Sequence, residues 1–135
     1  MIPKRGGVDH IEVNVSDLAE SKGFYESVLK WMGYERILEG NNFVAWGNGE
    51  VKIFLAMWKN YKARFHRRRV GLNHIAFRAE SRLDVDRFYR EFLIQREIRI
   101  LYGGPKPYPE YSPTYYAVYF EDPDRIKLEY IHRTD

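Results

Sequence analysis

Three side chains of the kinds that bind metal ions, His10, His74 and Glu129, stand in strand-like segments far apart in the sequence. Apolar residues alternate with them, and alternation along a strand sends successive side chains to opposite faces of a sheet. This parity places all three on surfaces turned away from the predicted helices. Two neutral imidazoles and one carboxylate can bind a divalent metal ion and leave coordination positions open. A lone histidine in a strand is more often structural, so that alternative stays open.

Other polar side chains share this surface. Glu12, two residues after His10, is the nearest candidate for a general base, although pairing with Lys52 or Arg78 would occupy it instead. The remaining side chains are assigned to substrate binding: Lys52, Phe54, Arg78 and Lys127. The two lysines would attract an anionic substrate, or else they point outward into solvent at the edge of the cleft.

An internal repeat must position these side chains. Five residues of the first half have an identical residue 64 positions later in the sequence. The first set is His10, Ile11, Phe24, Tyr25 and Leu29, and the second is His74, Ile75, Phe88, Tyr89 and Leu93. Residues 51–53 return as residues 126–128, at an offset of 75, which predicts a longer loop in the second copy at 103–109. The repeat predicts module 1 at about 7–60, a linker at 61–69 and module 2 at about 70–132.

Each module shows the pattern of one strand, one helix and three further strands. In module 1 we expect strands at 8–15, 34–39, 42–47 and 50–57, with a helix that begins after Asp17 and ends at Gly33. In module 2 we expect strands at 72–79, 97–102, 114–121 and 125–131, with a helix at 83–95. The predicted fold class is α+β: two tandem βαβββ modules whose mixed β-sheets form a cupped cleft, with the helices outside.

Length and composition narrow the function classes. A chain of 135 residues predicts a single domain over 1–135. It has no cysteine, which excludes disulfides, thiolate metal sites and a cysteine nucleophile. It has no apolar run of about 20 residues and no apolar core of a signal peptide near its start, so we expect a cytoplasmic protein without membrane contact. A net charge of +3 is too small to favour nucleic acid binding.

The linker carries a basic tract with aromatic residues, from Lys62 to Arg69. Such tracts bind nucleic acid or other anions in some proteins, but most are hydrated loops. We do not expect a nucleic acid partner, and the role of the tract stays open.

The paired βαβββ pattern resembles the vicinal oxygen chelate superfamily, which includes glyoxalase I, extradiol dioxygenases, fosfomycin-resistance transferases and bleomycin-resistance proteins. The segments that carry the resemblance are 9–11, 24–26, 71–77 and 119–129. The last is the most specific, although Arg125 stands where members commonly have glycine, a residue that permits positive φ. The resemblance covers nearly the whole chain.

The resemblance implies that His10, His74 and Glu129 bind a divalent metal ion, with Fe, Mn, Ni, Co and Zn all compatible with such ligands. In glyoxalase I-like enzymes a fourth ligand, a carboxylate, binds the metal and takes part in proton transfer. Its position aligns with Phe54, which can neither bind a metal nor accept a proton. The remaining set is similar to that of extradiol dioxygenases, in which a tyrosine at the place of Tyr119 contacts substrate, although a tyrosine is also an ordinary β-sheet residue. The set is similar to that of the fosfomycin transferases as well. We therefore expect a metal-dependent enzyme that acts on a small oxygen-rich molecule, with dioxygenase, lyase, isomerase and transferase chemistry all open. We also expect the protein to form a homodimer. The alternative is a metal-free binding protein like the bleomycin-resistance members.

Overall fold

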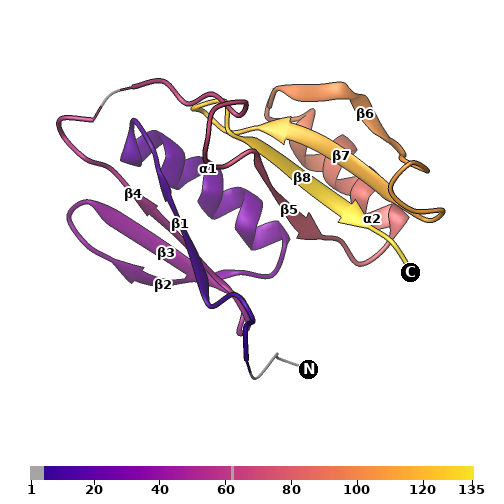
Figure 1. The fold of residues 1–135 in the computed structure, drawn as a ribbon, viewed down its shortest axis with the longest axis horizontal. Helices are drawn as coiled ribbons and strands as arrows, with labels where there is room; N and C mark the ends of the chain where they lie inside the picture. Colours follow the sequence, from indigo (N-terminus) through magenta and orange to yellow (C-terminus); the bar gives the residue numbers. More distant parts are fainter. Residues whose placement is uncertain (1–4, 62) are drawn as a thin grey trace. The chain divides into compact units, whose positions relative to one another are not determined.

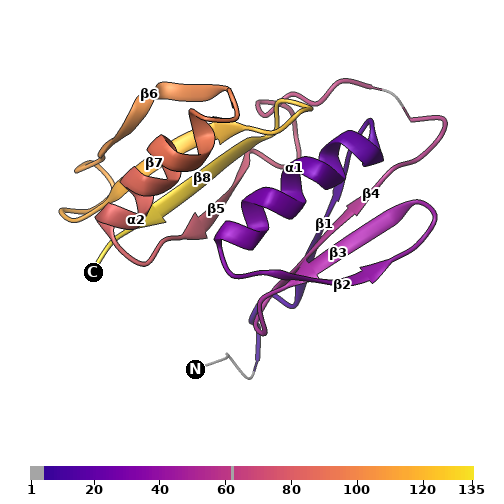
Figure 2. The same cartoon turned by 180° about the vertical axis from the view of Figure 1, so that it is seen from behind.

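The computed structural model describes residues 5–61 and 63–135 of the chain. The chain divides into two compact units, residues 1–63 and 64–135. Each unit contains one four-stranded sheet with helix on one face, as Figures 1 and 2 show. The predicted α+β fold of two tandem βαβββ modules is confirmed. The boundary falls inside the predicted linker, and residues from 64 onward belong to the second unit.

The described residues of the first unit form one helix and four strands. Its elements are β1 (His10–Asn14), α1 (Leu18–Trp31), β2 (Glu35–Glu39), β3 (Phe43–Gly47) and β4 (Lys52–Ala56). The strand order is β1-β4-β3-β2, and only the β1–β4 pair is parallel. The α1 helix lies along one face of this sheet (Figure 1).

Local sequence sets the limits of α1. The side chain of Asp17 accepts a hydrogen bond from the Glu20 backbone N–H, which satisfies one of the free donors at the helix start. Gly33 follows the helix with φ of +88°, a left-handed conformation that glycine adopts without strain. The helix buries its apolar stripe against the sheet, where Trp46 of β3 is almost fully enclosed. The Trp46 indole N–H donates to Glu26, so the buried ring leaves no polar atom unpaired.

The second unit repeats this arrangement with changes. Its elements are β5 (His74–Arg78), α2 (Arg82–Arg87), η1 (Phe88–Leu93), β6 (Ile100–Pro107), β7 (Tyr116–Glu121) and β8 (Lys127–His132). The strand order is β5-β8-β7-β6, and only β5 and β8 are parallel. The predicted helix is present as one helical segment, but its second half, η1, is π-helical.

Strand register confirms the repeat residue by residue. In the first unit His10 pairs with Lys52, and in the second unit His74 pairs with Lys127. The same shift of 64 on one strand and 75 on the other relates every pair of the two parallel ladders. The sheet faces follow as predicted, because the residues between these positions are the ones buried under the helices.

The predicted loop at 103–109 is wrong in its position. Residues 103–107 belong to β6, whose pairing with β7 shifts between Leu101 and Lys106, and the connection to β7 is the segment 108–115. Consecutive positive φ angles at Tyr102, Gly103 and Gly104 produce this irregularity. The residues that the second unit has in excess of the first therefore bend the edge strand β6, and they also lengthen the connection to β7.

The turn before β8 keeps its shape without glycine. Arg125 adopts φ of +67°, a left-handed conformation that glycine reaches without strain and a residue with a β-carbon does not. The Asp122 carboxylate accepts hydrogen bonds from the backbone N–H groups of Asp124 and Ile126, which fixes the turn from inside. In the parts of the chain that the structure describes, no helix combines the length and apolar character that crossing a membrane requires.

Candidate functional site

His74 and Glu129 lie side by side on the helix-free face of the second sheet. They belong to the neighbouring strands β5 and β8, and His74 Nε2 is 3.1 Å from Glu129 Oε1. The Glu129 side chain is 1% exposed, whereas one third of the His74 side chain remains accessible. Two of the three predicted metal ligands are therefore brought together within one unit.

Hydrogen bonds select the nitrogen of His74 that faces Glu129. The Asn73 amide nitrogen donates to the Arg67 carbonyl, so the Asn73 oxygen Oδ1 is turned toward His74 Nδ1, 2.6 Å away. Since Oδ1 only accepts, Nδ1 carries a hydrogen, and in neutral His74 the Nε2 atom presents a lone pair to the carboxylate. Two acceptors at this distance repel each other unless a proton or a metal cation lies between them.

Two tyrosines complete the surroundings of Glu129. The Tyr115 hydroxyl donates to Glu129 Oε2 at 2.5 Å, and Tyr119 lies opposite Glu129 in the β7–β8 pair. Burial and the nearby Glu129 charge raise the pKa of Tyr119 well above its usual range, so its phenol stays protonated. The Tyr119 ring is 6.1 Å from the His74 ring, centroid to centroid. A protonated phenol at this place can donate to a substrate oxygen.

His10, the third predicted ligand, has a similar local arrangement in the first unit. Its Nδ1 atom lies 2.8 Å from Asp9 Oδ2, so Nδ1 carries the hydrogen and Nε2 is left as an acceptor. The other Asp9 oxygen accepts from the Lys52 ammonium at 3.2 Å. The hydrogen bond from His10, followed by that from Lys52, lowers the pKa of Asp9 and keeps it ionised. Lys52 thus contacts Asp9, not Glu12.

Phe54 occupies in the first sheet the place that Glu129 has in the second. It pairs with Glu12 as Glu129 pairs with Ala76, and its ring lies 5.2 Å from the His10 ring. A phenyl ring cannot bind a metal or accept a proton, so this position offers only an apolar wall. Glu12 is exposed and makes no hydrogen bond or ion pair with the described residues of its unit.

The remaining predicted binding residues lie in different settings. The Lys127 ammonium is positioned over the rings of Tyr102 and Tyr119. Arg78, exposed on β5, lines a shallow hollow of about 210 Å³ together with Tyr115 and Arg133.

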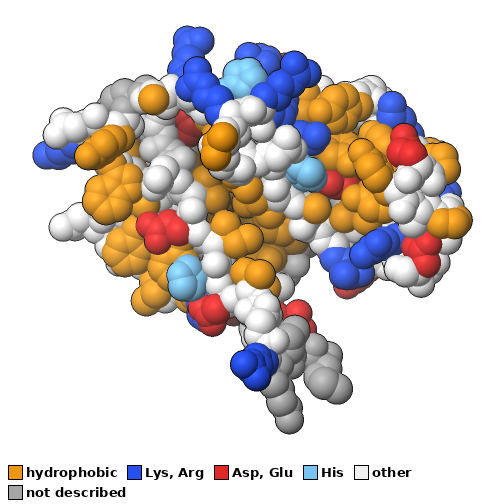
Figure 3. Space-filling model, viewed as in Figure 1, with side chains coloured by type: hydrophobic (Ala, Val, Ile, Leu, Met, Phe, Trp, Pro, Cys, Tyr) orange, Lys and Arg blue, Asp and Glu red, His pale blue; other side chains and the backbone are white. Residues whose placement is uncertain are grey.

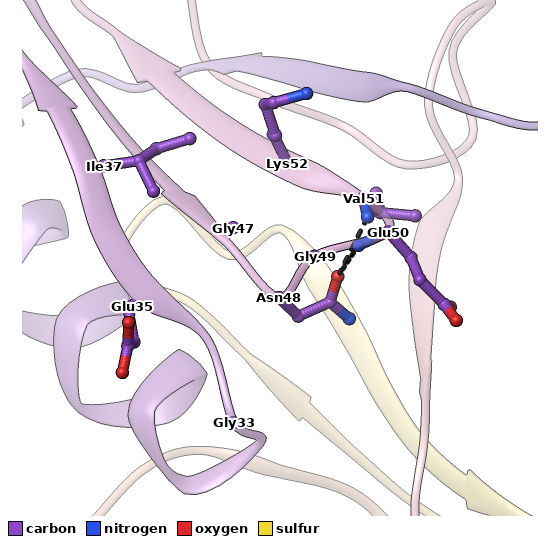
Figure 4. Close-up of a pocket in the computed structure, with 9 residues that line it drawn as sticks. All are labelled: Gly33, Glu35, Ile37, Gly47, Asn48, Gly49, Glu50, Val51 and Lys52. Atoms are coloured by element: carbon purple, nitrogen blue, oxygen red, sulfur yellow. Dashed lines mark hydrogen bonds between the residues drawn. The ribbon is translucent and has the colours of Figure 1, made fainter. Parts of the chain in front are cut away.

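A larger hollow of about 470 Å³ lies in the first unit, at the β3–β4 turn. Figure 4 shows that the turn is closed by Asn48, whose side-chain oxygen accepts from the backbone N–H groups of Glu50 and Val51. Lys52 is the single predicted site residue in its lining, and none of the three predicted ligands takes part. We therefore place the candidate chemistry at the ligand side chains.

Residues 64–69 of the basic tract belong to the second unit, whereas Lys62 lies outside the described residues. The Arg67 guanidinium donates to the buried Glu121 carboxylate at 2.7 Å and to the Arg125 carbonyl. Figure 3 shows Lys and Arg side chains gathered over the segment that precedes β5. Part of the charge of the tract is thus neutralised within the protein.

Sequence reasoning missed the partners of the predicted ligands. Tyr115 shares its parity with Tyr119, so alternation along β7 could have revealed it. Asp9 and Asn73, the residues before the two histidines, are themselves repeat counterparts.

Among the described residues of either unit, no group of three or more His, Asp or Glu side chains could hold a metal ion.

Comparisons with known proteins agree with this architecture. The family model described as "Glyoxalase/Bleomycin resistance protein/Dioxygenase superfamily" matches residues 7–130. The uncharacterized protein YqjT of Bacillus subtilis is 39% identical over 124 residues, which are 90% of this chain and 95% of YqjT. The crystal structure of a presumed glyoxalase from Bacillus halodurans superposes with a TM-score of 0.86 at 35% identity, covering 96% of this chain and 97% of that one. A glyoxalase/bleomycin resistance/dioxygenase domain from Frankia sp. EAN1pec has a TM-score of 0.79 at 24% identity, over 96% and 98% of the chains.

Proposed function

Because the chain belongs to the glyoxalase/bleomycin resistance protein/dioxygenase superfamily, we propose that it is a metal-dependent enzyme acting on a small oxygen-rich molecule. The proposed ligands are His10, His74 and Glu129, with His10 supplied by the same chain or by a second copy in a homodimer. The ion is divalent, of the group Fe, Mn, Ni, Co and Zn.

One observation carries this proposal, namely the contact between His74 Nε2 and Glu129 Oε1 with the histidine hydrogen on the other nitrogen. A histidine that binds metal typically donates its other ring N–H to a neighbouring acceptor, which fixes both tautomer and orientation. Asn73 is that acceptor for His74, and Asp9 is that acceptor for His10. These two contacts support the proposal, because each leaves the Nε2 atom of its histidine free to bind a cation.

A divalent ion held by three protein ligands would polarise a carbonyl or stabilise an enolate or catecholate through two adjacent substrate oxygens. The protein contributes the groups around that centre. The Tyr119 phenol, kept protonated by burial, donates a hydrogen bond to a substrate oxygen, while Glu12 accepts a proton from substrate. Phe54 supplies an apolar wall next to the His10 ring.

The ligand set favours chemistry similar to that of extradiol dioxygenases over that of glyoxalase I. The latter requires a carboxylate at the position where Phe54 stands, and Phe54 has neither charge nor proton affinity. Lyase, isomerase or transferase chemistry that uses three protein ligands remains compatible with the same residues.

Metal content is the test of this proposal. The protein, purified without chelator, should contain a transition metal, or take up Mn²⁺ or Fe²⁺ after treatment with EDTA. The His74→Ala and Glu129→Gln variants should lose affinity by more than the roughly 10- to 100-fold that outer-shell changes cost. His66→Ala, which removes a linker histidine, serves as the control. Absence of bound metal and of uptake would overturn the proposal and leave the metal-free binding protein as the function.

A further inference from the structure

We propose that the Lys127 ammonium and the Tyr102 hydroxyl form an oxyanion subsite on the second sheet, and that this subsite binds an anionic group of the substrate. The subsite lies next to the proposed ligands, because Lys127 stands two residues before Glu129 on the same face of β8. Tyr102 reaches it from β6, where its ring contacts the ring of Tyr119. Anion binding depends only on residues of the second unit.

Lys127 presents a positive charge without a carboxylate partner. Its Nζ atom lies 4.9 Å from the Tyr102 ring centre and 4.8 Å from the Tyr119 ring centre, and it forms no ion pair with the described residues of its unit. Its repeat counterpart Lys52, by contrast, is paired with Asp9. Two aromatic faces orient the Lys127 ammonium but do not neutralise it, so it can still bind an anion.

The backbone at Tyr102 is strained for a residue with a side chain. Tyr102 has φ of +60° and is followed by Gly103 and Gly104 at +88° and +108°. Half of its side chain is exposed, so packing in the core does not account for a tyrosine at this place. Strained non-glycine positions cluster at functional sites. Here the bend places the phenol beside Lys127.

A second cation reinforces the positive potential around this phenol. Lys127 and, after it, Arg67 lower the pKa of Tyr102. Arg67 is fixed by its bonds to Glu121 and to the Arg125 carbonyl. The single Glu121 carboxylate also lies within 3.5 Å of two further guanidiniums, those of Arg99 and Arg125.

A further tyrosine hydroxyl lies in the same aromatic cluster. Tyr108 packs edge-on against Tyr119, and its hydroxyl is buried without a hydrogen-bond partner among the described residues. A buried donor of this kind is rare unless a ligand or water satisfies it. A cationic ammonium and a phenol O–H together suit an anionic oxygen group such as a carboxylate or a phosphate. That this group belongs to the enzyme's substrate rests on the proposed function, whereas anion binding itself does not.

The test is a calorimetric titration of the EDTA-treated full-length protein at low ionic strength with inorganic phosphate and, separately, with acetate. Saturable binding of one of them supports the subsite, and the tighter of the two identifies tetrahedral or planar anions as its ligands. Lys127→Gln and Tyr102→Phe should each weaken that binding at least about tenfold, since each removes a charge-assisted contact. Lys30→Gln, with the same charge change on the exposed face of α1, should bind like the unchanged protein.

Two results would overturn the subsite. One is that neither anion binds saturably, and the other is that the Lys127→Gln and Tyr102→Phe variants bind the anion as tightly as the unchanged protein. Thermal unfolding confirms that each variant is folded, and Tyr102→Phe keeps the ring while it removes only the hydroxyl. Metal uptake is measured on the same proteins. Lys127→Gln should retain metal uptake, and Glu129→Gln should retain anion binding, so failure of one proposal is distinguishable from failure of the other.

Discussion

The Oδ1 atom of Asn73 lies 2.6 Å from the Nδ1 atom of His74, and this contact sets which nitrogen of His74 is available to a metal. We expect Asn73→Ala to weaken metal binding roughly 10- to 100-fold, the usual cost of losing an outer-shell partner. Asn73→Asp should restore most of the affinity, because a carboxylate also accepts from Nδ1, as Asp9 does beside His10. Competition titration against a metal indicator measures both variants. Equal losses in the two would show that Asn73 has a different role.

Tyr115 is expected to position Glu129 for metal binding. Its hydroxyl donates to Glu129 Oε2 at 2.5 Å, and without it one oxygen of a buried carboxylate loses its partner. Tyr115→Phe should therefore reduce metal affinity about tenfold or more. Tyr116→Phe is a matched control, because the Tyr116 hydroxyl donates to Asp86, a residue of α2. A loss of affinity in the control as large as in Tyr115→Phe would contradict the prediction.

The stability of the second unit should fall as the solution becomes alkaline. Burial and a hydrogen bond to Asp86 raise the pKa of Tyr116 from its ordinary value of 10.0 to about 12, and burial and a hydrogen bond to Asp84 raise that of Tyr130 further. Below the ordinary pKa, folded and unfolded chains both hold these protons, so the two phenols contribute no pH dependence. Above it the unfolded chain releases them first, and the free energy of unfolding falls with pH.

Urea unfolding at a series of alkaline pH values measures this effect, and tyrosinate absorbance follows the ionisation. The double variant Tyr116→Phe/Tyr130→Phe should show a shallower fall. If its slope equals that of the unchanged protein, the two phenols are not responsible.

Arg125→Gly should stabilise the protein. A left-handed backbone costs a residue with a β-carbon about 1–2 kcal/mol, and the greater freedom of glycine in the unfolded chain offsets about 0.5–1 kcal/mol of the relief. We expect a net gain of about 0.5–1 kcal/mol by urea unfolding, since the contact of Arg125 with Glu121 is long and its guanidinium largely exposed. Arg125→Ala keeps the β-carbon and should bring no gain. A gain of equal size in both variants would assign the effect to the lost charge.

The sequence alone was sufficient to predict what depends on alternation and repetition. Parity along the strands placed His74 and Glu129 on one face, and the structure brings them to 3.1 Å. The sequence alone could not predict that Tyr102 lies beside Lys127. Three consecutive residues with positive φ, beginning at Tyr102, interrupt the alternation of side chains there. The Asp9 and Asn73 contacts were also missed, since hydrogen bonds between adjacent residues depend on rotamers that no spacing encodes.

The equivalence of Phe54 and Glu129 has a consequence for how such a protein can evolve. When a site is built from identical copies of a single module, every copy must carry the same residue at a given position. Fusion of two copies into one chain removes that constraint, and each copy can then mutate on its own. In this chain the two equivalent positions hold an aromatic ring in one half and an ionisable group in the other, so a substitution at either position changes the chemistry of one half only.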